Sequence, residues 1–159
     1  MHDEIVLRDV VDSDLPIFFE QQQDEGANWM AAFTAKDPAD REAFMAHWAR
    51  IRGDESNVIQ TILYDGRVAG SVSSYLEEPG RPEVTYWLGR EYWGQGIATR
   101  ALTAFLDRMT TRPVYARAAK DNTGSLRVLG KCGFTIIGEG RGFANARGAE
   151  VEEYLLRLE

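Results

Sequence analysis

The sequence predicts a single α/β (α+β) domain, built on one mixed sheet of about seven strands and flanked by about four helices. Three observations support this fold class. The chain has 159 residues, the usual length of one domain. Helix-type segments lie between groups of strand-type segments. No linker, internal repeat or low-complexity tract interrupts the chain. We therefore expect one domain over residues 1–159.

The composition excludes several classes of protein. Hydrophobic content of 44% and charged content of 27% are ordinary for a globular chain. No apolar run approaches the ~18 residues of a membrane span, and the acidic start Met1-His2-Asp3-Glu4 lacks the apolar core of a signal peptide. Without a membrane span, we expect no association with membranes. Because the single cysteine, Cys132, cannot form an internal disulfide, we expect a cytoplasmic protein. Cys132 itself is expected to be a small buried side chain.

The N-terminal part predicts one strand and two helices. β-branched residues favour a first strand from residue 5 to 11, and Asp12 or Ser13 can cap the helix that follows. We expect that helix to end near Gly26 and residues 27–38 to be irregular.

A second helix is expected to open at Pro38 and to end at Gly53. Its apolar residues Phe44, Trp48 and Ile51 recur at steps of four and three, which places them on one helical face.

The remaining strands are marked by β-prone residues and by turn signals. Asp65-Gly66 is a strong hairpin signal between two of them. The expected strands cover 58–64, 67–76, 83–88, 114–119, 134–138 and 151–158.

Two further helices are expected in the C-terminal half. The first, 97–109, carries an apolar stripe at Ala98, Leu102, Phe105 and Met109. The second is short, is capped by Asp121 or Asn122, and ends at Gly133.

The glycine-rich segment between a strand and a helix is the first motif with chemical meaning: Tyr92-Trp93-Gly94-Gln95-Gly96-Ile97-Ala98-Thr99. Two glycines let the backbone approach a ligand closely. The first N–H groups of the helix have no internal partner, and with the helix dipole they favour a phosphate. The segment lacks the G-K-[ST] of nucleotide hydrolases and the full G-x-G-x-x-G of dinucleotide-binding folds. A tight turn without a ligand is the alternative interpretation.

Charge is distributed unevenly along the chain. The net charge of −7 argues against nonspecific nucleic-acid binding. Residues 90–147, however, carry ten basic and four acidic side chains, a net charge of +6, and the remainder carries −13. Such asymmetry could hold an anion in one part and a cation in the other, or it could be ordinary solvated surface.

A second motif follows the first by about twenty-five residues, with Asn122, Ser125 and Lys131-Cys132-Gly133-Phe134. Together the two motifs resemble the GNAT superfamily of acetyl-CoA-dependent N-acetyltransferases, in particular the branch resembling ribosomal-protein serine and alanine N-terminal acetyltransferases. The resemblance covers nearly the whole chain. It implies an enzyme that transfers an acetyl group from acetyl-CoA directly to a primary amine.

The resemblance also implies a set of cofactor-binding residues. Leu88 and Gly89 would pair through their backbones with the pantetheine arm, and the Leu88 N–H could polarise the thioester carbonyl. Asn122 would bind the pantetheine, and Lys131 or a neighbouring arginine the phosphates. The pyrophosphate would lie against the backbone N–H groups of Gly94, Gln95, Gly96, Ile97, Ala98 and Thr99.

For catalysis we expect Glu83 to accept the amine proton through a water molecule; an exposed carboxylate at a strand end is the alternative. Many superfamily members have a tyrosine where this chain has Leu129. Ser125 is therefore expected to stabilise the departing thiolate, with an ordinary first-turn or capping serine as the alternative. His2 and His47 indicate neither a catalytic triad nor a metal site.

The sequence departs from the common family pattern at two positions. Gly130 stands inside a helix where glutamate is common, and should cost about 1 kcal/mol of helix stability relative to alanine. Trp93 differs from many superfamily members but is usual in this branch.

The acceptor side should lie in the acidic N-terminal part. Trp29 and Phe33, with Met30, could form an apolar wall or simply pack in the core, and Glu25 lies among further acids (Glu20, Asp24 and Asp37). We expect a cationic acceptor, either a small-molecule amine or the N-terminus of a basic peptide or protein. A noncatalytic acyl-CoA-binding module is the alternative function, and the resemblance makes a homodimer possible.

Overall fold

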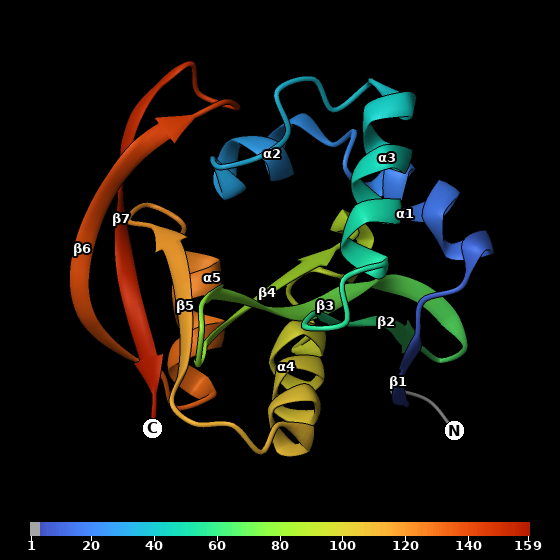
Figure 1. The fold of residues 1–159 in the computed structure, drawn as a ribbon. Helices are drawn as coiled ribbons and strands as arrows, with labels where there is room; N and C mark the ends of the chain where they lie inside the picture. The colour runs from blue at the N-terminus through green and yellow to red at the C-terminus, as the bar shows by residue number, and fades with distance from the viewer. Residues whose placement is uncertain (1–3) are drawn as a thin grey trace.

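A computed structural model of the chain describes residues 4–159, apart from the side chains of residues 77 and 78. Over this range the chain forms one seven-stranded sheet with five α-helices (Figure 1). The strands are β1 (Ile5–Asp9), β2 (Val58–Tyr64), β3 (Arg67–Glu78), β4 (Arg81–Leu88), β5 (Val114–Ala119), β6 (Thr135–Ala144) and β7 (Ala149–Leu158). The helices are α1 (Leu15–Gln21), α2 (Glu25–Ala31), α3 (Arg41–Arg52), α4 (Ile97–Arg108) and α5 (Thr123–Lys131), with short 3₁₀ helices η1 (Asp12–Asp14) and η2 (Arg90–Tyr92).

The sheet has the strand order β1-β2-β3-β4-β5-β7-β6 and is mixed, as predicted. Neighbouring strands are antiparallel except β4 and β5, which run parallel. The register of β4 and β5 contains one aligned pair, Glu83 and Tyr115. Beyond that pair the two strands diverge. Helix α4 covers one face of the sheet, and α1 to α3 lie on the other side (Figure 1).

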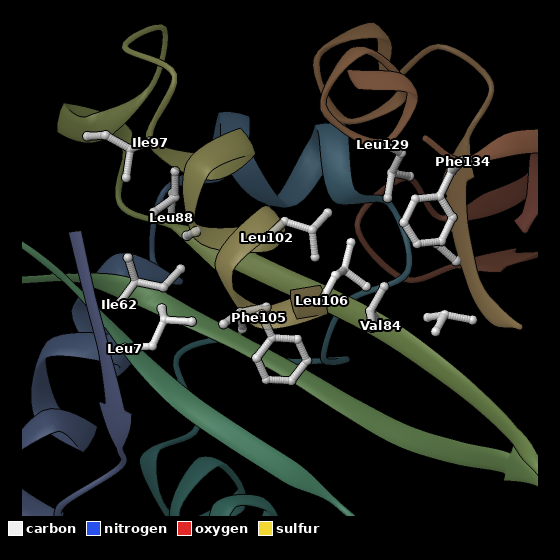
Figure 2. Close-up of a cluster of buried hydrophobic side chains, with 14 of the residues drawn as sticks. Leu7, Ile62, Val84, Leu88, Ile97, Leu102, Phe105, Leu106, Leu129 and Phe134 are labelled. Carbon is white, nitrogen blue, oxygen red and sulfur yellow. The ribbon is translucent and has the colours of Figure 1, made fainter. Parts of the chain in front are cut away.

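The main core lies between α4 and the sheet (Figure 2). Leu102 and Phe105 are fully buried against residues of β1 to β4 such as Ile62 and Val84, which confirms the centre of the predicted stripe. Each such side chain contributes about 1.5–3 kcal/mol through burial. The ends of the stripe, Ala98 and Met109, are only half-buried.

A second cluster fixes α1 and α3 on the opposite face. Phe18 of α1 stacks on Trp48 of α3, with ring centroids 5.1 Å apart, and Phe44 is buried beside them. The predicted apolar face of the second helix is therefore confirmed, although Ile51 is only half-buried.

The turn before α1 is held by Asp14, not by a cap from Asp12 or Ser13 as predicted. The buried Asp14 carboxylate accepts two hydrogen bonds from Arg8, at 2.7 and 2.9 Å, and one from the Thr61 hydroxyl at 2.7 Å. Burial raises the pKa of Asp14, but these hydrogen bonds and one from the Val11 N–H outweigh it, so the pKa lies below its usual value. This network ties α1 to β1 and β2.

The prediction of one long first helix followed by an irregular segment was wrong. Helix α1 ends at Gln21, and a separate helix, α2, occupies part of the segment expected to be irregular. The reason is local, because the Asp24 side chain accepts a hydrogen bond from the Ala27 N–H at 3.0 Å and so begins a new helix.

Strand β6 is longer than predicted, because it continues past Gly138 to Ala144. Glycine weakens an isolated strand, but here Gly140 and Gly142 pair with Glu153 and Val151 of β7. Pairing between strands therefore overrides the local preference.

Helix α2 is attached to the rest of the fold by two arginines. Arg90 of η2 donates to Asp24 through Nε at 2.5 Å and through Nη2 at 2.9 Å. Arg147, from the β6–β7 turn, donates through Nε to the Trp29 carbonyl at 2.8 Å and pairs with Asp121. These contacts fix α2 between the glycine-rich segment and the C-terminal hairpin.

Replacing Gly130 by alanine should stabilise the protein. The residue is exposed in α5, and an added Cβ would meet no atom within 4 Å. Since alanine is the better helix former, we expect the free energy of unfolding to rise by about 1 kcal/mol, measured by urea denaturation. Gly133→Ala is the matched control and should lower it, because Gly133 has a φ of +97° and its Cβ would lie 3.1 Å from Leu158. A destabilised Gly130→Ala would contradict this account.

The Asp24–Arg90 ion pair should make stability depend on pH. Hydrogen bonds from Arg90 and from the Ala27 N–H lower the pKa of Asp24 to about 2. Because the unfolded value is about 3.9, the pair stabilises the fold above pH 4, and this contribution is lost as pH falls toward 2. Asp24→Asn keeps a capping side chain without the charge, so it should lower the melting temperature slightly at pH 7.

The pH series supplies the decisive comparison for this pair. The difference in melting temperature between wild type and Asp24→Asn should narrow below pH 4. Asp40→Asn, at the corresponding cap of α3 where the carboxylate accepts the Ala43 N–H, is the control and should change little. A constant difference across the pH range would show that the charge of Asp24 does not matter.

Candidate active site

A cavity of about 530 Å³ opens where β4 and β5 diverge. Four parts of the chain surround it: α2, the end of β4 with the segment after it, the amino end of α4, and α5. Its walls are formed by Ala27, Met30, Ala31, Tyr86, Trp87, Leu88, Tyr92, Trp93, Gly94, Gly96, Ile97, Ala98, Thr99, Asn122, Gly124, Ser125, Arg127, Val128 and Lys131.

The amino end of α4 points unpaired N–H groups at this cavity. Gly96 takes a left-handed conformation, with φ at +78°, and no side chain caps the helix. The Arg100 N–H donates to the Gly96 carbonyl, so the N–H groups of residues 97–99 precede the helical hydrogen-bond ladder. Such an end binds anions.

The structure thus brings most of the predicted phosphate segment to the cavity wall. Gly94, Gly96 and residues 97–99 lie there. Gln95 does not, and its side-chain amide donates to the Glu91 carbonyl at 2.9 Å instead.

The two backbone positions predicted at the end of β4 differ in what they can bind. The Gly89 N–H donates to Ala69, and its carbonyl accepts from the Tyr92 N–H, both at 2.9 Å. Both backbone groups of Gly89 therefore already have partners within the protein, and its pairing with the pantetheine arm stays a prediction. In an antiparallel ladder the preceding residue points the other way, so the Leu88 N–H faces the gap beside β5. The Leu88 carbonyl accepts from Trp93 Nε1 at 3.0 Å.

Helix α5 supplies the opposite wall. Asn122 caps the helix, since its Oδ1 accepts the Ser125 N–H at 3.2 Å. Ser125 therefore lies in the first turn of α5, the position of the alternative interpretation. It also lies on the cavity wall, so its predicted role at the thiolate stays a prediction. Lys131 and Arg127 are exposed on the same side and offer positive charge to a ligand there.

Tyr86 stands beside Ser125 and was not predicted as a site residue. Burial raises the pKa of the Tyr86 phenol, and hydrogen bonding with the Ser125 side chain partly opposes this. The strand alternation of Val84, Tyr86 and Leu88 could have indicated the position, because these side chains share one face.

Glu83 lies outside the wall of the large cavity. It is not the exposed strand-end carboxylate of the alternative interpretation, because it is inside β4 and 4% exposed. Arg117 Nε lies 3.0 Å from the Glu83 carboxylate, and Arg117 Nη1 lies 3.5 Å from that of the buried Glu153.

A second cavity of about 40 Å³ lies between β4 and β5. Tyr86 and Ser125 belong to its walls as well as to those of the large cavity, and Arg117 borders it too. A space of this size with polar walls can hold water. The small cavity therefore lies between Ser125 and Arg117, the ion-pair partner of Glu83.

The residues predicted to bind the acceptor lie away from the large cavity. Trp29 is 52% exposed and stacks under the Arg147 guanidinium, 4.8 Å from the ring centroid. Phe33 is 40% exposed and approaches Gly142 of β6. Glu25 is exposed at the start of α2. Neither aromatic side chain packs in the core.

The helical periodicity of α2 explains this result. Ala27, Met30 and Ala31 share one face and reach the wall, which leaves Trp29 on another face. Because residues 27–38 were expected to be irregular, the sequence did not indicate which side chains share a helical face.

The remaining reactive side chains lie elsewhere. Cys132 is half-buried, not fully buried as predicted, with Sγ 3.7 Å from the Thr99 carbonyl. His47 is exposed on α3, and His2 lies outside the described residues. Within residues 4–159 no three His, Cys, Asp or Glu side chains gather where they could hold a metal ion. No helix in that range is long and apolar enough to cross a membrane.

Comparison with known proteins places this arrangement in a family. The family model described as an acetyltransferase (GNAT) domain matches residues 4–135. A candidate ribosomal N-acetyltransferase of Bacillus subtilis, YdaF, is 30% identical over 131 residues, which cover 76% of this chain and 70% of that protein.

Solved structures agree with the fold. RimJ of Mycobacterium smegmatis, in complex with CoA-disulfide, has a TM-score of 0.82 at 22% identity. The match covers 97% of this chain and 81% of the RimJ chain. Spermidine N-acetyltransferase of Vibrio cholerae, in complex with CoA and spermine, has a TM-score of 0.79 at 16% identity. The match covers 96% of this chain and 95% of that protein's chain. The chain therefore belongs to the GNAT acetyltransferase family and is an acetyl-CoA-dependent N-acetyltransferase.

Proposed function

We propose that this enzyme acetylates the primary amine of a cationic acceptor, either a small polyamine-like molecule or the N-terminus of a basic protein. One observation carries the proposal. The large cavity brings together an anion site at α4, Leu88 and Ser125, and the small cavity beside Ser125 is bordered by Arg117, the ion-pair partner of the buried Glu83 carboxylate.

The residues at the amino end of α4 fit the diphosphate of coenzyme A. The unpaired N–H groups of residues 97–99 offer hydrogen bonds, and the helix dipole adds positive potential. Gly94 and Gly96, with positive φ, allow an anion to approach the backbone. Arg127 and Lys131 add charge on the side of α5. The bound acetyl-CoA supplies the thioester that donates the acetyl group.

Leu88 and Ser125 would act on opposite ends of the reacting thioester. The Leu88 N–H faces the gap and would stabilise negative charge on the carbonyl oxygen. Ser125 would donate a hydrogen bond to the sulfur as it takes the electron pair. Leu129 offers no polar group for that task and is buried.

Glu83 would remove the proton from the acceptor ammonium. Its carboxylate is paired with Arg117, and the small cavity bordered by Arg117 provides room for a connecting water. This route explains how a buried residue that is absent from the wall of the large cavity could still serve the reaction.

The charge of the N-terminal part supports a cationic acceptor. Glu20, Glu25 and Asp37 are exposed around α2, whereas Asp24 is paired with Arg90. Relatives include proteins named for both acceptor classes, spermidine and the ribosome. The alternative, a noncatalytic acyl-CoA-binding module, gives Glu83 and Ser125 no function.

The family resemblance also suggests a homodimer, which is a further proposal. A homodimer could use β6, an edge strand that exposes Ile136, Ile137 and Phe143. The cytoplasmic location stays a prediction.

Acceptor charge should decide the rate of acetylation. We expect thiol release from acetyl-CoA to be faster with spermidine or with a basic peptide than with an amine that carries a carboxylate. Glu83→Gln should lower kcat by about a hundredfold, as loss of a general base does. Glu139→Gln, an exposed acid on β6, is the control and should not change kcat. Faster turnover of anionic amines would contradict the cationic acceptor, and an unchanged kcat would remove Glu83 from the mechanism.

Lys131 should contribute to cofactor affinity. We expect Lys131→Ala to raise the KM for acetyl-CoA about threefold at low salt, with a smaller effect at high salt, because the contact is exposed and screened. Arg141→Ala removes an equally exposed charge on β6, where it pairs with Glu152, and should leave this KM unchanged. If both variants behave alike, the effect is one of net charge and not of a contact by Lys131.

A further inference from the structure

Tyr86 occupies the point where the two cavities meet. Tyr86 borders both of them, and Ser125 is the only other described residue common to the two walls. The Tyr86 side chain is half-buried and packs against the main core. Its hydroxyl interacts with the Ser125 side chain.

We propose that Tyr86 is a positioning residue and proton source that acts through Ser125 on the departing thiol. The inference rests on the proposed function, because Ser125 must face the sulfur. It assigns to β4 the phenol that the chain lacks at Leu129 on α5.

The departing thiol receives its proton through a relay of two hydroxyl groups. The C–S bond breaks, and the sulfur takes the electron pair. The Ser125 hydroxyl proton passes to the sulfur, the phenol proton of Tyr86 passes to Ser125, and water in the small cavity returns a proton to Tyr86. The acceptor ammonium loses two protons as the amide forms, one toward Glu83 and one to solvent, so no outside reagent is needed.

The Tyr86 phenol is protonated at physiological pH and so holds the proton that the relay needs. Burial raises its pKa and makes it a weaker acid, so donation requires nearby groups that stabilise the phenolate. The charged and titratable groups around it are Arg117, which borders the small cavity from β5, Arg127 and Lys131, which border the large cavity from α5, and the Cys132 thiol at the end of α5. The Arg117 guanidinium would stabilise a transient phenolate.

A double-mutant cycle tests whether Tyr86 acts through Ser125. Tyr86→Phe keeps the ring and should lower kcat by about a hundredfold, with the KM for acetyl-CoA unchanged. In a Ser125→Ala background the same change should have an effect of less than about twofold, since the relay is already broken. Tyr154→Phe is the matched control, because it removes the hydroxyl of another half-buried tyrosine, on β7. It should leave kcat unchanged.

A second readout does not depend on activity. Carbon-13 labelling of tyrosine lets NMR follow the ionisation of Tyr86, assigned by its loss in Tyr86→Phe. Because Ser125 lowers the pKa of Tyr86, Ser125→Ala should raise that pKa further. An unchanged pKa would show that the two hydroxyls do not interact and would overturn the inference.

The outcomes separate the two proposals. Wild type that releases no thiol with any amine of the panel overturns the proposed function, and the inference falls with it. An active wild type with an unaffected Tyr86→Phe overturns the inference alone. Equal effects of Tyr86→Phe with and without the Ser125 hydroxyl would do the same, because they indicate a packing role.

Discussion

The divergence of β4 and β5 is the constraint on which the site depends. The two strands run parallel but align at one pair only, Glu83 and Tyr115, after which backbone groups such as the Leu88 N–H face a gap instead of a neighbouring strand. An unpaired strand edge inside a domain is costly unless a ligand or another group satisfies it. A bound cofactor arm can do so, and the helices on either side close the gap.

Helix α4 turns this gap into a preorganised site. Its middle is anchored by Leu102 and Phe105, which are fully buried against the sheet. The unpaired N–H groups at its amino end are therefore held in place before any ligand arrives, and little reorganisation is needed on binding. Gly96 at the cap provides the sharp entry that a side chain would hinder.

The sequence predicted the mixed seven-stranded sheet, the apolar stripe of α4 and most of the glycine-rich segment that lies on the cavity wall, because these depend on local patterns such as the spacing of Gly94 and Gly96. It failed at α2 because the cap formed by Asp24 was not recognised. Without that helix, Trp29 could not be assigned to the face that lies away from the cavity wall, where Arg147 of the β6–β7 turn stacks on its ring. Tyr86 was missed because only the fold brings β4 next to Ser125.

The charge asymmetry of the sequence has a different meaning in the structure. Several basic residues of the 90–147 segment are used in ion pairs that hold elements together: Arg90 with Asp24, Arg117 with Glu83 and Glu153, Lys120 with Glu139 and Glu152, and Arg147 with Asp121. On the wall of the large cavity the basic side chains are Arg127 and Lys131. Much of the positive charge of the segment is therefore used within the fold, and under the proposed function an anion would be bound chiefly by backbone N–H groups. Because those groups carry no net charge, the affinity they provide should depend less on salt than the net charge of the segment implies.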